Sequence, residues 1–325
     1  MELGRFCALS ISLVLTHDPE ILQVLLMLSK AFTEAIKEYK APMSLVNRII
    51  ETGCSRKMGK KILKMLENLA FDGVRFLCLY GITMTGDNML RFALLVRKVP
   101  YLLDLDLSRT GLTDAGVKLL VRVLMSLRFL NTLTLQENRF KWSGVLELAR
   151  LSEKRENIEK LDLEGTPIFT EVNETPMAMY KFKKLDLSDT GLKNEHMAML
   201  VEHQKHAEVS LQDLRAVRNA LTAEGGFHAA ALIMLGLKCL SIADNKVGDE
   251  GAKHIARALK DSKMEGLHMS MNEIGDEGAE ALAVGIGESK TILYVTLHYN
   301  NFSEEGEQVL EASEEGHVSL RLLYV

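Results

Sequence analysis

Two hydrophobic periodicities alternate along the chain. In "LDLSRTGLTDAGVKLLVRVL", residues 105–124, apolar and polar residues first alternate with a period of two, and the spacing becomes helical after Gly111 and Gly116. The first period is typical of a strand, the glycines of a turn, and the second period of a helix. A later unit places four apolar residues at helical spacing, namely Ala252, Ile255, Ala256 and Leu259. Each unit therefore predicts a strand, a turn and a helix whose apolar stripe packs against the next helix.

The unit is repeated ten times from residue 77 onward. Its core, of the type LxL, starts at Leu77, Leu105, Leu133, Leu161, Leu185, Leu214, Leu240, Leu267, Val295 and Leu323. Successive starts are separated by 28, 28, 28, 24, 29, 26, 27, 28 and 28 residues. Self-similarity at a period of this length predicts a solenoid in which each unit packs against its neighbours.

The seventh unit, "LKCLSIADNKVGDEGAKHIARAL", resembles the leucine-rich repeat of the ribonuclease-inhibitor type, whose consensus is LxxLxLxxNxLxxxGxxxLxxxL. The resemblance extends over residues 74–325, as about nine full repeats and a terminal strand. It implies the α/β class and a right-handed horseshoe-shaped solenoid, with parallel strands on the concave face and helices on the convex face. Residues 1–73 lack the repeat, and we expect them to form a helical N-terminal cap over the first repeat.

Residues 1–73 contain two segments with apolar residues at helical spacing, at 21–32 and 58–69. The second segment also has a basic face, which is either a solvated helix surface or a patch for a membrane surface or an acidic partner. This face comprises Arg56, Lys57, Lys60, Lys61 and Lys64. Residues 1–15 include an apolar run but no small-residue cleavage site, so we interpret them as part of the cap rather than as a signal peptide.

The acidic stretch around Asp244 does not fit a calcium loop. An EF-hand loop starting there would need glycine at position 6 and glutamate at position 12, where the chain has Asp249 and Ile255. The resemblance instead assigns Asn245 to a ladder position, whose side-chain amide bonds backbone groups of the turn. Across the units, the ladder position holds Asn138, Asn219, Asn245, Asn272 and Asn300, or Ile82, Thr110, Thr166 and Thr190. The fourth unit is short and contains Pro167 and Pro176, so we expect an extended segment and a local change of curvature there.

Composition narrows the functional classes. With 39 Lys and Arg against 44 Asp and Glu, the net charge of −5 argues against a nucleic-acid binder. No stretch approaches the roughly 20 apolar residues of a membrane span. The four cysteines show no CxxC spacing, so neither a zinc ribbon nor a dense disulfide framework is indicated, and we expect a reducing, cytoplasmic compartment. Cys78 and Cys239 are expected to be free thiols, because six strand spacings, roughly 29 Å, would separate them.

Candidate catalytic and metal-binding groups are sparse. No nucleophile–base pair or carboxylate dyad stands out, so we expect a protein that is not an enzyme and that needs no cofactor. His196, His203 and His206 have a spacing that could grip a metal ion, but no cysteine or carboxylate is fixed in register with them. We therefore expect no metal site.

The residue between the leucines of each LxL is expected on the concave face, because side chains alternate along a strand. An acidic zone on the second to fifth strands comprises Asp104, Asp106, Glu137, Asp162, Glu164, Asp186 and Asp189, with Lys160 and Lys184 among them. An aromatic zone on the eighth to tenth strands comprises His268, Tyr294, His298, Tyr299 and Tyr324. Exposed tyrosine and histidine are typical interface anchors, whereas the acidic zone fits a solvated surface and a site for a basic partner equally well.

The resemblance implies a protein-binding role, because such arrays serve as nuclease inhibitors, ligand-sensing ends of immune receptors, Ran GTPase activators and secreted effectors of intracellular bacteria. The sequence contains no evident nucleotide-binding or ligase domain and no long acidic tail. We therefore expect a monomeric, non-catalytic scaffold that binds a partner protein on its concave face, as an effector or an inhibitor. As an effector, it would act in the cytoplasm of a host. The alternative is a GTPase-activating regulator that supplies or positions polar groups at the nucleotide of a small GTPase.

Overall fold

The computed structural model describes residues 75–325, apart from residues 85–86, 98, 156, 170–180, 315–316, 318 and 321. The chain forms two compact units, Met1–Arg139 and Phe140–Val325. The predicted N-terminal cap, its basic face and the possible leader at residues 1–15 lie outside the described residues. The predicted boundary after residue 73 therefore stays a prediction, and the division after Arg139 was not anticipated.

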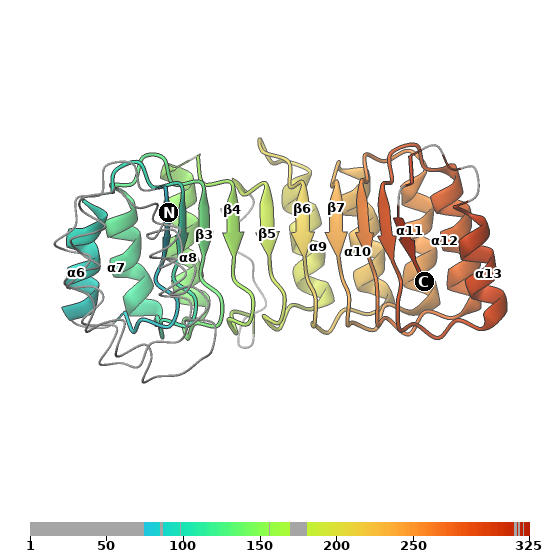
Figure 1. Ribbon diagram of the computed structural model, residues 1–325, viewed down its shortest axis with the longest axis horizontal. Helices are drawn as coiled ribbons and strands as arrows, with labels where there is room; N and C mark the ends of the chain where they lie inside the picture. The colour runs from blue at the N-terminus through green and yellow to red at the C-terminus, as the bar shows by residue number, and fades with distance from the viewer. Residues whose placement is uncertain are drawn as a thin grey trace, which may run out of the picture. The chain divides into compact units, whose positions relative to one another are not determined.

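Unit 1 contains three strands and two helices within its described residues (Figure 1). They follow one another as β1 (Phe76–Cys78), α6 (Asp87–Val96), β2 (Asp104–Asp106), α7 (Asp114–Leu124) and β3 (Thr132–Thr134). The strands are parallel and pair in chain order, with Leu77 opposite Leu105 and Leu105 opposite Leu133. The predicted LxL register is therefore the register of the sheet.

Unit 2 continues the same alternation of short strands and helices (Figure 1). Its elements are α8 (Trp142–Lys154), β4 (Lys160–Asp162), β5 (Lys184–Asp186), α9 (Asn194–Gln204), β6 (Asp213–Arg215), α10 (Ala223–Met234), β7 (Cys239–Ser241), α11 (Gly248–Leu259), β8 (Gly266–His268), α12 (Asp276–Glu288), β9 (Tyr294–Thr296), α13 (Glu304–Ala312) and β10 (Leu322–Tyr324). These strands are also parallel and in chain order. The predicted α/β solenoid, with a strand at each of the ten LxL positions, is confirmed.

The core consists of the predicted strand leucines and helix stripes. Leu240 is fully buried at the centre of β7, while Cys239 and Ser241 on either side are partly exposed. The stripe of α11 is buried as expected, including Ile255 and Leu259. Helices α10 and α11 approach so closely that a Cβ atom on Gly226 would lie 2.6 Å from the Cα atom of Gly251. Small residues at these positions therefore allow the helices to pack backbone against backbone.

The asparagine ladder is formed as predicted. In the Asn245 side chain, Nδ2 donates to the carbonyls of Ala216 and Ile242 at 3.0 and 2.9 Å, and Oδ1 accepts from the Leu221 amide at 3.1 Å. One side chain thus bonds backbone groups of two neighbouring repeats, which would otherwise be buried without partners. Where threonine replaces asparagine, only part of this pattern survives: Thr190 Oγ1 donates to the Leu187 carbonyl at 2.6 Å within its own repeat.

The residue before the ladder position adopts a left-handed backbone conformation in seven units of the described chain, which sequence reasoning did not anticipate. The φ values lie between 49° and 58° at Arg109, Glu137, Asp189, Arg218, Asp244, Met271 and Tyr299. Gly81 and Gly165 occupy the same position in two further units, with φ values of 73° and 69°. Non-glycine residues rarely adopt this conformation, because it costs conformational free energy. The hydrogen bonds of the ladder residue that follows hold the turn in this conformation.

Several further expectations concern residues that the structure describes in part. Cys78 and Cys239 are free thiols, as predicted, whereas Cys7 and Cys54 lie outside the described residues. Of the expected extended segment of the fourth unit, residues 166–169 are described and contain no helix, whereas residues 170–180 lie outside the described residues. Within the described residues, no helix combines the length and apolarity that crossing a bilayer requires.

Candidate protein-binding surface

The five residues of the predicted aromatic zone all lie in unit 2, on the last three strands or directly after β9. We call them the aromatic surface: His268 on β8, Tyr294 on β9, His298 and Tyr299 in the following turn, and Tyr324 on β10. Tyr299 is 83% exposed and Tyr324 is 46% exposed, while the other three side chains are partly buried. Large aromatic side chains on short, fixed strands are therefore available to a partner at this part of the sheet.

The structure brings these side chains into contact. The rings of His268 and Tyr294 lie 5.3 Å apart between their centroids, and those of His298 and Tyr324 lie 5.1 Å apart. His298 also lies 6.2 Å from the Tyr299 ring. The aromatic surface is thus two groups of tilted rings rather than five isolated side chains, and this packing limits the rotamers that each ring can adopt.

Tyr294 is held in a fixed orientation. Its hydroxyl lies 3.1 Å from the Sγ atom of Cys239, and its ring covers Gly266, where a Cβ atom would collide with it. The hydrogen bond with Cys239 and partial burial raise the pKa of Tyr294, and burial raises the pKa of the Cys239 thiol, so both groups are neutral near pH 7. Gly266 and Cys239, which the sequence analysis did not connect with this zone, therefore position its central tyrosine.

His268 and Tyr299 are also held by neighbouring repeats. His268 Nδ1 lies 2.8 Å from the Thr296 hydroxyl on β9, and burial together with the charge of Arg215 lowers the pKa of His268. Tyr299 precedes Asn300, whose Nδ2 donates to the carbonyls of Leu297 and Met269 at 2.6 and 3.1 Å. The imidazole is therefore neutral near pH 7, and the turn that carries Tyr299 is fixed on both sides.

The acidic zone is divided between the two units, and two of its three members in unit 1 are engaged by other residues of that unit. Asp106 Oδ1 accepts hydrogen bonds from the amide and the hydroxyl of Ser108, at 2.8 and 2.6 Å. Glu137 forms an ion pair with Arg109, and Asp104 is partly exposed on β2. The carboxylates of Asp106 and Glu137 are thus largely satisfied by unit 1 itself.

In unit 2 the prediction that Asp162 and Asp186 lie on an exposed surface was wrong. These side chains are only 6% and 5% exposed. Asp186 forms an ion pair with Arg215 Nε at 3.0 Å and accepts a hydrogen bond from the Ser188 amide at 3.0 Å. Asp162 accepts one from the Glu164 amide at 3.2 Å. Each carboxylate folds over the end of its strand onto the backbone, which removes it from the surface.

The other acidic residues of unit 2 differ in their surroundings. Glu164 is partly exposed and forms an ion pair with Arg218 at 2.6 Å. Asp189 is exposed, and its φ of 52° places it at the left-handed turn position after β5. Asp189 therefore stays available to solvent, whereas Glu164 is partly neutralised.

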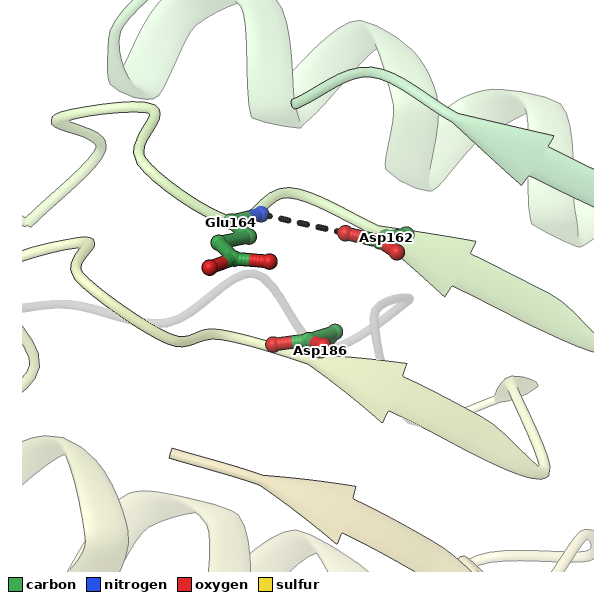
Figure 2. Close-up of side chains that lie close together, drawn as sticks. All are labelled: Asp162, Glu164 and Asp186. Carbon is green, nitrogen blue, oxygen red and sulfur yellow. Dashed lines mark hydrogen bonds between the residues drawn. The ribbon is translucent and has the colours of Figure 1, made fainter. Parts of the chain in front are cut away.

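Asp162, Glu164 and Asp186 form a carboxylate cluster, in which one oxygen of each lies within 4.8 Å of the others (Figure 2). Such a cluster would attract a cation if its charge were uncompensated. Arg215 and Arg218 already pair with Asp186 and Glu164. The cluster is therefore part of an internal ion-pair network, and it does not support a metal site.

The predicted histidine spacing is explained by helix capping. His196 is fully buried, its Nδ1 accepts the Lys193 amide at 3.0 Å, and its ring stacks on Phe169 at 4.4 Å. His206 is exposed near Glu202, and burial lowers the pKa of His203. His196 thus bonds the first turn of α9 and fills the core next to it.

Comparison with known proteins supports the repeat that was assigned from the sequence. A family model described as "Leucine Rich repeat" matches residues 100–121, 237–256 and 260–283. The chain is 28% identical over 230 residues to NACHT, LRR and PYD domains-containing protein 9 of Bos taurus, covering 68% of this chain and 23% of that protein. It is 27% identical over 234 residues to ribonuclease inhibitor of Sus scrofa, covering 69% of this chain and 51% of the inhibitor. The chain is a leucine-rich repeat protein.

This leucine-rich repeat protein is related to ribonuclease inhibitor and to the repeat arrays of the NACHT, LRR and PYD domains-containing proteins. The human protein 14 of that group is 28% identical over 200 residues, covering 59% of this chain and 17% of the relative. The chain thus spans about half or less of the length of these relatives. Arrays of this type are generally non-catalytic and typically bind proteins.

The sequence of this leucine-rich repeat protein did contain a signal for the network that buries the acidic zone. Asp186 on β5 lies directly opposite Arg215 on β6 in the sheet register, and both are the third residue of their strand. Aligning the units therefore places the two charges side by side. The ion pair of Arg218 with Glu164, 54 residues apart, has no such signal, because these residues belong to repeats that are not adjacent.

Proposed function

We propose that this leucine-rich repeat protein is a non-catalytic scaffold that binds a partner protein on the strand face of unit 2, with the aromatic surface as its anchor. The main support is that five aromatic side chains on β8, β9, β10 and the turn after β9 form two groups of neighbouring rings, while Tyr299 and Tyr324 remain exposed. Tyrosines that are already oriented before binding lose little conformational entropy, and buried aromatic residues dominate the energetics of many interfaces.

The charge of unit 2 supports a partner with a basic surface. Residues 140–325 contain 20 Lys and Arg and 31 Asp and Glu, so their net charge is −11. Because Asp162 and Asp186 are buried, we assign the steering of such a partner to the overall field of the unit rather than to the acidic zone. Asp189 is the member of that zone in unit 2 with the greatest access to solvent.

The finer role that we propose is that of an inhibitor or an effector, which blocks or redirects its partner by occupying a surface of it. Its relation to porcine ribonuclease inhibitor, whose name describes inhibition by an array of this type, supports this role. Free Cys78 and Cys239 agree with action in the reducing cytoplasm.

Affinity capture followed by mass spectrometry tests the proposal. The wild-type chain is compared with a Tyr299→Ala/Tyr324→Ala double variant, which we expect to lose the captured partner. The control is Phe227→Ala, which removes another exposed aromatic side chain, from α10. If the double variant captures the same proteins in the same amounts as the wild type, the binding site is not the aromatic surface.

A further inference from the structure

Unit 1 exposes an aromatic stack in the loops that lead from a helix into the next strand. Tyr101 and Phe129 are each 51% exposed, and their ring centroids lie 5.5 Å apart. The Arg75 guanidinium lies 5.2 Å from the centroid of the Tyr101 ring, and its Nη1 donates to the Tyr101 carbonyl at 3.4 Å. Three consecutive repeats therefore contribute one continuous stack of a cation and two rings.

The repeat itself does not require this stack. Tyr101 and Phe129 each lie four positions before the central leucine of their strand, Leu105 and Leu133. The same position in the later repeats holds Asn157, Lys181, Ser210, Gly236, Lys263 and Thr291. Because every later repeat folds with a small, polar or charged residue there, the two exposed rings need an explanation outside the packing of the solenoid.

The charge around the stack is positive, unlike that of the rest of the array. Residues 75–139 contain nine Lys and Arg and five Asp and Glu, a net charge of +4, whereas residues 140–325 carry −11. No Asp or Glu occurs in residues 88–103 or 115–136, which cover most of α6 and α7 and the loops that follow them. Arg97 and Arg128 lie in these loops, both are exposed, and neither forms an ion pair with another described residue.

We propose that this basic aromatic edge of unit 1, formed by Arg75, Arg97, Tyr101, Arg128 and Phe129, binds an acidic segment of a second protein. An apolar side chain of that segment would pack on the two rings, and its carboxylates would pair with the arginines, whose planar groups match a carboxylate with two parallel hydrogen bonds. A protein segment suits this edge better than a lipid surface, because Tyr101 and Phe129 are the large exposed apolar side chains within the two described loops, and guanidinium groups flank them. This edge shares no residue with the aromatic surface of unit 2.

The test uses a short fluorescein-labelled peptide of Glu and Asp with interspersed Phe and Leu residues, measured by fluorescence anisotropy at low salt. A matched peptide replaces every Glu and Asp by Gln and Asn. We expect the full chain to bind the acidic peptide and to bind the neutral one at least tenfold more weakly.

Two double variants locate the binding site on the chain. Arg97→Glu/Arg128→Glu should weaken binding of the acidic peptide by at least tenfold, and Tyr101→Ser/Phe129→Ser should weaken it by about tenfold. Arg257→Glu, which reverses the charge of an exposed arginine on α11 of unit 2, is the control and should bind as the wild type does.

Circular dichroism and thermal unfolding establish that each variant is folded, which we expect because all four substituted side chains are exposed. The proposal is overturned if the wild type does not bind the acidic peptide, if it binds both peptides equally, or if the variants bind like the wild type. The proposal is also overturned if the wild type does not bind the peptide but sediments with phosphatidylserine vesicles, and the variants do not. This result would assign the edge to lipid binding. Tyr299→Ala/Tyr324→Ala should leave peptide binding unchanged. A failure of this proposal can therefore be distinguished from a failure of the proposed function.

Discussion

At the scale of single residues, two kinds of polar side chain bond the turns of the repeat: the ladder asparagines, and the carboxylates of Asp162 and Asp186 at the ends of their strands. The ladder asparagines have one task in every repeat, which is to bond the carbonyls and amides of the turn, so the repeat pattern identifies them. Asp162 and Asp186 have the same place in the LxL pattern as exposed residues. Their burial depends on hydrogen bonds to their own turns and, for Asp186, on Arg215, 29 residues further along the chain.

The first prediction concerns the ladder. Asn272 is fully buried, and its Nδ2 donates to the carbonyls of Ile242 and Met269 at 2.9 and 3.1 Å. Asn272→Ala should lower the free energy of unfolding by about 2–3 kcal/mol, because it leaves buried backbone groups without partners. Asn272→Thr should recover part of this loss, since Thr110 and Thr190 retain the bond to the carbonyl three residues earlier.

Urea unfolding followed by circular dichroism measures these values. The control is Asn301→Ala, because the side chain of Asn301 is exposed and its backbone amide alone bonds, to the Ile274 carbonyl. Equal losses for Asn272→Ala and Asn301→Ala would mean that the ladder contributes no special stability.

The second prediction follows from the correction of the acidic zone. Asp186→Lys places an ammonium group beside Arg215 at a nearly buried position, so it should destabilise unit 2 by about 2 kcal/mol, even after solvent screening at the exposed arginine. Asp189→Lys changes the same charge at an exposed position and should alter stability by no more than about 0.5 kcal/mol. Thermal unfolding compares the two variants, and similar melting temperatures would contradict the burial of Asp186.

At the scale of elements, the two hydrophobic periods predicted every strand and helix of the described repeats, because a strand and a helix bury different spacings of side chains. The spacing between helices could not be derived in this way. It depends on which glycines of neighbouring helices meet, as Gly226 and Gly251 do, and the sequence does not distinguish such a glycine from one that faces solvent.

The third prediction separates these two kinds of glycine. Gly226→Ala should destabilise the chain by about 1–3 kcal/mol, because the new Cβ atom would lie 2.6 Å from the Cα atom of Gly251 on α11. Gly287→Ala on α12 meets nothing within 4 Å and should stabilise the chain by about 0.5–1 kcal/mol through helix propensity. Chemical denaturation of both variants is decisive, since a shift of the same sign in both would refute the close packing of α10 on α11.

At the scale of the whole molecule, the regular repeat hides a difference between the two units. Residues 75–139 carry a net charge of +4 and residues 140–325 carry −11, yet the LxL spacing continues from one unit into the next. The spacing of the leucines indicates which residues are buried, but it does not indicate how charge is distributed along the array. We therefore assign two recognition chemistries to one solenoid: aromatic anchors in the acidic unit 2, and the basic aromatic edge in unit 1.

The central claim is that a partner protein binds to the aromatic surface of unit 2, and surface plasmon resonance with the captured partner measures it most directly. Tyr299→Ala and Tyr324→Ala should each accelerate dissociation by about tenfold or more while changing the association rate little. Phe227→Ala, which removes an exposed ring from α10 outside both proposed binding surfaces, is the control and should leave both rates unchanged. Dissociation as slow as that of the wild type in both unit 2 variants would contradict the claim.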